Sequence, residues 1–178
     1  MGAVYRIRQG FANLGARMHS EDWALVEQQL SKAERELFEQ MEPADQHHSV
    51  RVLRALLGLG ITDQDILKAA LLHDVGKSGC RISLLHRTLA VLWTAAVGIS
   101  PAFQLRSNDN NNSWWLPFYV LANHPRLGAS MLVRVGTKER VWRLVELHQL
   151  EPRLVGDLPD ASWVRAALAT LRIADNQN

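Results

Sequence analysis

The sequence is poor in cysteine, with only Cys80 among its 178 residues. A single thiol cannot form a disulfide within the chain, which excludes the small secreted domains that depend on disulfides. Long apolar runs are also missing, since the nearest candidate, residues 88–99, is shorter than the ~18 residues of a membrane-spanning helix. Arg6, Arg8 and Arg17 interrupt any apolar segment near the start, so no signal-peptide core is expected there. These absences predict a reduced, cytoplasmic protein.

An excess of one charge is lacking as well. Lysine and arginine number 20 and the acidic residues 18, and a net charge of +2 is too small to predict nucleic acid binding. The 11 glycines and 6 prolines are too few for a collagen-like or broadly disordered chain. A chain of this length can bury a core without disulfides. We expect one domain over residues 44–178, with residues 1–43 forming N-terminal helices packed on it.

Apolar residues recur at helical spacing along almost the whole sequence, and no run alternates as a strand does. The predicted fold class is therefore all-α. Helices are expected over residues 4–18, 20–41, 45–59, 63–76, 82–100 and 117–121, and then from Pro125, after Thr137 and from Asp160 onward.

Two of these segments have surfaces that suit a partner. Residues 4–18 form a basic amphipathic pattern that could lie on a membrane surface, or dock on the protein's own domain. Residues 88–99 are apolar nearly all round, so they are expected either to be deeply buried or to face a partner or lipid. A peripheral membrane or partner contact through 4–18 or 88–99 is thus one expectation.

Histidines and aspartates fall on faces that point into the predicted core. His48 shares its face with apolar residues whereas His47 shares its face with Arg51, so His48 is expected to point inward and His47 outward. His73 lies on an apolar face too, and Asp74 follows it directly. Two such neighbours diverge by ~100° on a helix and can converge only on an ion near the helix end.

Three further residues complete this set. His148 and Asp175 each extend the apolar stripe of a predicted helix, and a carboxylate there is costly unless a positive group meets it. His124 precedes Pro125 at a predicted helix start, where its side chain can turn away from the helix axis. Four imidazoles and two carboxylates are typical of a site for a first-row divalent metal. A single histidine on an apolar face is more often a core residue, which is the interpretation for His86.

The same residues carry a resemblance to a known family. The motif-bearing positions are His48, the run AALLHDVGK at residues 69–77, His124-Pro125, His148 and Asp175. Their types and order resemble the HD superfamily of metal-dependent phosphohydrolases, and HDVGK is similar to its HDIG-type motif. The resemblance covers about residues 45–176 and implies a compact multi-helix HD-domain bundle with the metal site in its helical core.

The resemblance also implies roles for these residues. One metal would be held by His48, His73, Asp74 and Asp175, and a second metal, bridged by Asp74, by His124 and His148. It implies one or two divalent ions, with iron or manganese ahead of magnesium, zinc, nickel or cobalt. Binuclear members cleave cyclic dinucleotides, and mononuclear relatives act on nucleotides.

Several positions depart from the family pattern. Related sequences often have His-His where this chain has Asn123-His124 and His148-Gln149, and an acidic residue where it has Arg126. The Gly-Tyr-Pro signature of the cyclic di-GMP subgroup is absent. A mononuclear and a binuclear site therefore both stay open.

The functional hypothesis is metal-assisted hydrolysis of a phosphoester of a nucleotide or cyclic dinucleotide, in which the metal lowers the pKa of bound water from ~16 toward ~7 to give hydroxide. Asp74 and Lys77 are the expected catalytic residues. Asp74 would hold or bridge the metal, and Lys77 would reach a phosphate oxygen, although a cation at a helix C-terminus also explains Lys77. Arg126 and Arg143 are secondary candidates for substrate contact or simply solvated surface residues.

The alternative is a regulatory or binding module of the same fold that docks on a partner or membrane without hydrolysis.

Overall fold

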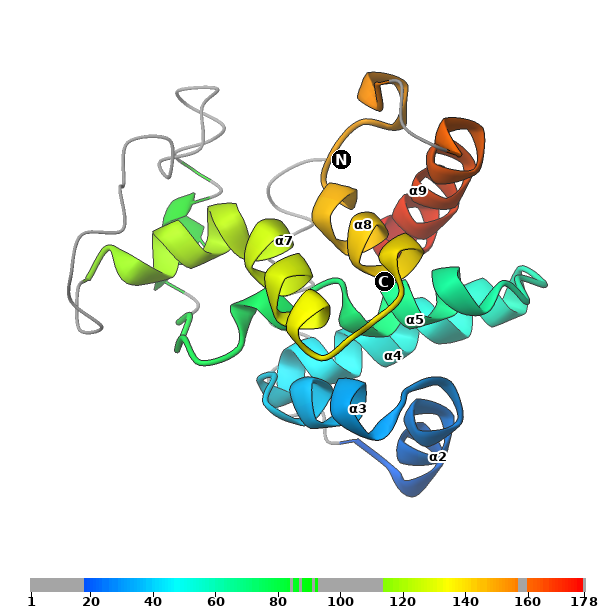
Figure 1. Ribbon diagram of the computed structural model, residues 1–178. Helices are drawn as coiled ribbons and strands as arrows, with labels where there is room; N and C mark the ends of the chain where they lie inside the picture. The colour runs from blue at the N-terminus through cyan, green and yellow to red at the C-terminus, as the bar shows by residue number, and fades with distance from the viewer. Residues whose placement is uncertain are drawn as a thin grey trace.

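The computed structural model describes residues 18–83, 85, 86, 88–90, 92, 114–156 and 160–177. Its helices are α2 (Ser20–Gln29), α3 (Lys32–Glu39), α4 (Pro43–Gly58), α5 (Gln64–Leu72), α7 (Leu116–Arg134), α8 (Glu139–Leu147) and α9 (Ala161–Gln177), with short 3₁₀ turns η1 (Val75–Lys77) and η3 (Pro152–Leu154). The described residues contain no strand, so the predicted all-α class is confirmed (Figure 1).

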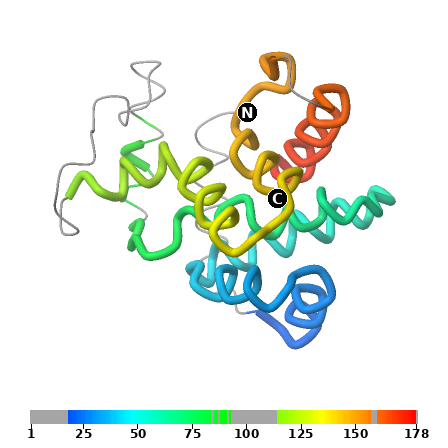
Figure 2. The backbone as a smooth tube through the Cα atoms, viewed as in Figure 1, coloured from blue at the N-terminus to red at the C-terminus, as the bar shows by residue number. Residues whose placement is uncertain are grey.

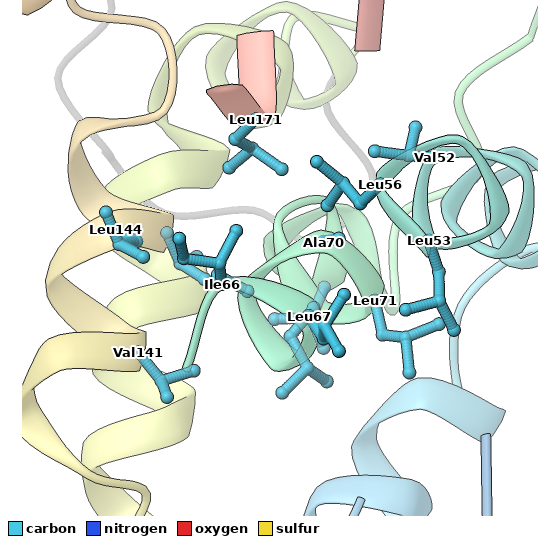
Figure 3. Packing of buried hydrophobic residues seen from close by; sticks show 14 of the residues in the cluster. Val52, Leu53, Leu56, Ile66, Leu67, Ala70, Leu71, Val141, Leu144 and Leu171 are labelled. Carbon is cyan, nitrogen blue, oxygen red and sulfur yellow. The ribbon is translucent and has the colours of Figure 1, made fainter. Parts of the chain in front are cut away.

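Helix α5 lies at the centre of the molecule and packs against α2, α3, α4, α8 and α9. Asp63 caps its N-terminus by accepting hydrogen bonds from two backbone N–H groups, and from Ile66 onward every residue of the helix except Lys68 is apolar. Its residues Ala69–Leu72 are completely buried. In Figure 3, Leu67 and Ala70 lie between Leu144 of α8 on one side and Leu53 of α4 on the other. The apolar second half of the helix, which is buried on nearly every side, therefore explains its central position.

The tube in Figure 2 shows that α2 and α3 lie on the opposite side of α4 and α5 from α9. Val26 of α2 and Phe38 of α3 belong to the same buried cluster as Leu168 of α9. The N-terminal helices from residue 20 thus share the main core.

The prediction of one helix over residues 20–41 is wrong, because the chain breaks between α2 and α3. Leu30 is extended, and Ser31 starts a new helix. The Ser31 backbone N–H donates to Glu34 Oε2 at 2.8 Å, while the Ser31 hydroxyl accepts the Glu34 N–H. This capping box outweighs the continuous apolar stripe that suggested a single helix.

The predicted helix start at Pro125 is also wrong. One helix, α7, runs from Leu116 to Arg134 with Pro125 in its interior. His124 is therefore in the middle of a helix and is almost completely buried. A side-chain hydrogen bond, described below, replaces the backbone bond that the proline cannot make.

Both predicted partner surfaces fall largely outside the described residues. Residues 4–17 are outside, as are most of 88–99; residues 85, 86, 88–90 and 92 are helical, with Leu85, Leu89 and Leu92 exposed. Within the described part of the chain, no helix combines the length and the apolar character needed to cross a bilayer.

Candidate metal centre

All six predicted metal ligands come together in the helical core. They are His48 of α4, His73 and Asp74 just after α5, His124 of α7, His148 just after α8, and Asp175 of α9. They form two triads, each with its potential ligand atoms within 4.8 Å of one another: His48 with His73 and Asp175, and Asp74 with His124 and His148. Because His73 and Asp74 are consecutive, the two triads are adjacent. The rings of His73 and His148 lie 5.3 Å apart between centroids.

Asp74 lies between the triads. Its Oδ1 is 3.3 Å from His124 Nε2, and its Oδ2 is 3.5 Å from His73 Nε2. The side chain is only 6% exposed. A carboxylate reached by imidazoles from both triads can serve either of them, or both together.

Three of the histidines are oriented in the same way. The Nδ1–H groups of His73 and His148 donate to the carbonyls of Ala70 and Val145, at 2.8 and 2.7 Å. Both carbonyls belong to the last turn of a helix, where the helix itself supplies no donor. A proton on Nδ1 leaves Nε2 with a free lone pair, which is the form that binds a metal. The ends of α5 and α8 thus fix the tautomers of two candidate ligands.

His124 obtains the same orientation from a proline. In a regular helix the carbonyl of Leu121 would accept the N–H of residue 125, but Pro125 has none. The Nδ1–H of His124 donates to that carbonyl instead, at 2.8 Å. The helix continues, and His124 Nε2 points to His148 Nε2, 3.3 Å away. Pro125 therefore both frees the carbonyl and directs the ring.

His48 and Asp175 form the side of the centre that is open to solvent. His48 Nε2 is 2.9 Å from Asp175 Oδ1, which also lies 3.8 Å from His73 Nε2. The Asp175 side chain is 39% exposed, in contrast to the buried Asp74, His73 and His124. The centre is therefore most accessible to solvent along this side, next to α9.

The electrostatics suit a cation. Burial raises the pKa of Asp74, but the positive charge of Lys77, together with the neighbouring imidazoles of His73 and His124, outweighs it and holds this pKa well below 3.8. Burial also opposes ionisation of Asp175, yet its hydrogen bond to His48 and the neighbouring imidazole of His73 lower its pKa to about 2. Both carboxyl groups are therefore ionised at neutral pH.

The pKa values of two imidazoles, those of His124 and His148, are lowered as well, which favours the neutral ring. Burial lowers the pKa of His124, and burial together with the cost of placing a positive charge beside the rings of His73 and His124 lowers the pKa of His148 to about 3. Both rings are neutral at pH 7. Ionised carboxylates and neutral imidazoles are the metal-binding forms, so this donor set fits a first-row divalent ion.

Lys77 contacts the centre directly. Its Nζ lies 2.6 Å from Asp74 Oδ2 and 3.9 Å from Asp45 Oδ1. The short 3₁₀ turn η1 begins directly after Asp74 and ends at Lys77, so the two side chains, three residues apart, lie on the same side of the turn. The structure thus places Lys77 beside the candidate ligand carboxylate.

Arg126 and Arg143 were predicted as secondary substrate contacts. Among the described residues, neither arginine contacts a candidate metal ligand. Arg126 is exposed and two positions beyond His124, and so on another face of α7. Arg143 pairs with Glu139 one turn earlier and lies over the Trp142 ring. His86, interpreted as a core residue, is buried beside Trp114 and Phe118.

Two residues near the centre were missed in the sequence. Gln149 directs its Nε2 to His124 Nε2 at 3.3 Å, and Asp45 lies beside Lys77. Both had a signal: Gln149 directly follows His148, and Asp45 precedes His48 by three residues, one helical turn.

Comparison with known proteins agrees with this geometry. A family model described as the HD domain matches residues 46–175, well over half of the chain. No curated protein and no solved structure matches. The matched range contains all six converging residues and the HDVGK motif. The chain therefore belongs to the HD domain family, whose members are typically metal-dependent phosphohydrolases.

Proposed function

We propose that this protein is a metal-dependent phosphohydrolase that cleaves a phosphoester of a nucleotide or cyclic dinucleotide. The observation that carries the proposal is the convergence of two adjacent triads of imidazole and carboxylate groups on the buried Asp74. A purely structural metal site needs four ligands that close the coordination sphere. Six donors from five parts of the chain, open on the Asp175 side, suit a site at which a substrate also binds.

The metal ligands in this proposal are His48, His73, Asp74 and Asp175, with His124 and His148 available for a second ion. A bound divalent ion supplies an acidified water and neutralises charge on the phosphoryl group. Burial of His73, Asp74 and His124 limits the access of bulk water to this part of the centre, so charges there interact more strongly than in solvent.

Lys77 has two tasks in the proposal. Without a metal, its ammonium group compensates the charge of Asp74, from which it is 2.6 Å away. With Asp74 bound to a metal, the ammonium group is available to a substrate phosphate. Three ammonium donors on a flexible stem allow this change of partner without backbone movement.

The first experiment is elemental analysis of protein purified without added metal. About two equivalents of iron or manganese would support a binuclear phosphodiesterase, and about one would support a mononuclear nucleotidase. No metal after reconstitution would reject the hydrolase proposal. His48→Gln tests the first triad, and His47→Gln is its matched control, because His47 is the neighbouring imidazole and belongs to neither triad.

Activity is then measured on nucleotides and cyclic dinucleotides with the metal-loaded protein. We expect Asp74→Asn to abolish turnover while the circular dichroism spectrum stays that of the wild type. Turnover retained in this variant would contradict the proposal. A wild-type protein that binds metal and nucleotide but hydrolyses none of these substrates would instead support the alternative of a non-hydrolytic binding module.

A further inference from the structure

Arg172 is on α9, the helix that carries Asp175, the most exposed of the candidate metal ligands. It lies three residues before Asp175, and such spacing puts two side chains on the same face of a helix. Its Nη2 lies 2.5 Å from Glu151 Oε1. Glu151 in turn follows His148 by three residues, so the ion pair joins the segment that carries His148 to the helix that carries Asp175.

The guanidinium group is only partly satisfied by this pair. Arg172 Nη1 is buried and has no hydrogen-bond partner among the described residues. A buried donor without a partner costs free energy, and guanidinium groups bind carboxylates and phosphates best through two parallel N–H donors. Arg172 therefore has an N–H donor without a partner among the described residues, on the helix that carries the candidate metal ligand Asp175.

Glu151 is a weak partner for Arg172. The two side chains are 43% and 38% exposed, and ion pairs this open to solvent contribute little free energy, ~1 kcal/mol at most. An incoming anion can replace Glu151 at small cost. The pair thus keeps the guanidinium group near the centre without binding it permanently.

We propose that Arg172 binds a non-bridging phosphate oxygen of the substrate and that Glu151 holds Arg172 in place until the substrate arrives. This inference rests on the proposed function and adds a residue to it. It predicts a substrate whose phosphate extends from the metal ligands toward α9, past the exposed Asp175.

The test uses inorganic phosphate as the probe. The full-length protein is loaded with manganese, its metal content is measured, and phosphate binding is followed by calorimetry. In Arg172→Gln we expect about tenfold weaker phosphate binding, the effect of losing a hydrogen bond to a charged group, at unchanged metal content. Arg172→Lys keeps the charge but loses the planar fork, so a smaller loss is expected. Arg172→Lys also serves if Arg172→Gln does not fold.

Glu151→Gln is expected to bind phosphate more tightly, because the competing carboxylate is gone. Arg140→Gln is the matched control. Arg140 forms a comparable exposed pair with Asp160, at the other end of α9, and we expect wild-type phosphate binding in this variant.

The outcomes separate the two proposals. Unchanged phosphate affinity in both Arg172 variants would overturn the role of Arg172 alone. So would a fall in metal content in Arg172→Gln, or equal weakening in Glu151→Gln, because the pair would then be structural. A wild-type protein that binds no manganese would reject the proposed function, and the role of Arg172 with it.

Discussion

Gly76 and Gly128 meet at the contact between η1 and α7. A Cβ on Gly76 would lie 2.5 Å from the backbone nitrogen of Gly128 and would overlap the carbonyl of His124. These neighbours are backbone atoms of a helix and cannot move aside independently. The absence of both side chains lets α7 approach closely enough for His124 to reach Asp74.

The first prediction concerns this contact. We expect Gly76→Ala to lower the free energy of unfolding by about 3 kcal/mol or more, because the added methyl group displaces α7. For Gly128→Ala we expect a smaller loss of about 1 kcal/mol, because alanine favours the helix but its Cβ would lie 3.1 Å from the backbone nitrogen of Gly76 and 3.2 Å from Val75 Cγ1, contacts that are tight without overlapping. Urea unfolding of both variants measures the difference. Equal effects would show that α7 and η1 adjust freely.

The second prediction concerns Pro125. In Pro125→Ala the restored N–H competes with His124 Nδ1 for the carbonyl of Leu121, so the imidazole is no longer fixed. We expect equal or higher thermal stability, because a helix-interior proline is removed, but about tenfold weaker metal binding, as is typical when the hydrogen-bond partner of a ligand histidine is lost. Metal titration followed by calorimetry, with a melting curve for the same sample, tests both parts. A loss of stability without weaker metal binding would contradict it.

The third prediction concerns the pH dependence of the metal-free protein. The pKa of His148 is about 3 in the folded state, below the ordinary value of 6.5. Between these pH values the unfolded chain binds a proton that the folded protein does not, so His148 makes the protein less stable as the pH falls through this range. We expect its imidazole signals in NMR spectra to stay those of a neutral ring down to about pH 4.

His148→Gln provides the control, since it removes the titrating group. Its unfolding free energy is expected to fall less than that of the wild type between pH 6.5 and 4.5. Identical pH profiles for the two proteins would contradict the prediction, because they would show that the pKa of His148 is the same in the folded and unfolded states.

The fourth prediction concerns the buried pair of Glu34 and Lys68. Lys68 Nζ lies 2.8 Å from Glu34 Oε2, and the glutamate side chain is 4% exposed. Burial raises the pKa of Glu34, but the hydrogen bonds from Lys68 and Ser31 outweigh it, so the net shift is downward from 4.5. The stabilisation is therefore complete above pH 4.5 and is lost as the pH falls through the lowered folded value.

In Glu34→Gln the amide can still accept the Ser31 N–H, but Lys68 loses its carboxylate. We expect a loss of about 2 kcal/mol at pH 7, the size of a hydrogen bond to a charged group. The difference from the wild type should shrink in acid, where Glu34 is itself protonated. Urea unfolding at pH 7 and near pH 3 tests this, and a difference that is constant with pH would contradict it.

Much of the fold and the convergence of the centre could be predicted from the sequence. Helical periodicity predicts that His48, His73, His148 and Asp175 point into the core. The family resemblance assigns these residues and His124 to one metal site. Their convergence around Asp74 depends on how the helices pack against one another, which helical periodicity alone does not predict.

The errors have local physical causes. The chain breaks at Ser31 because its capping box with Glu34 terminates an apolar stripe that otherwise continues. α7 passes through Pro125 because a side chain takes over the missing backbone bond. The pairing of Arg172 with Glu151 joins residues 21 positions apart, and no periodic pattern links them. Such long-range polar contacts need the packed structure.

The hydrogen bond between His48 and Asp175 closes a segment of 127 residues. During synthesis this bond cannot form until residue 175 has left the ribosome and α9 has packed against α4. Until then His48 and His73 lack the third member of their triad. The triad of His48, His73 and Asp175 can therefore be completed only after α9 has folded onto the rest of the domain.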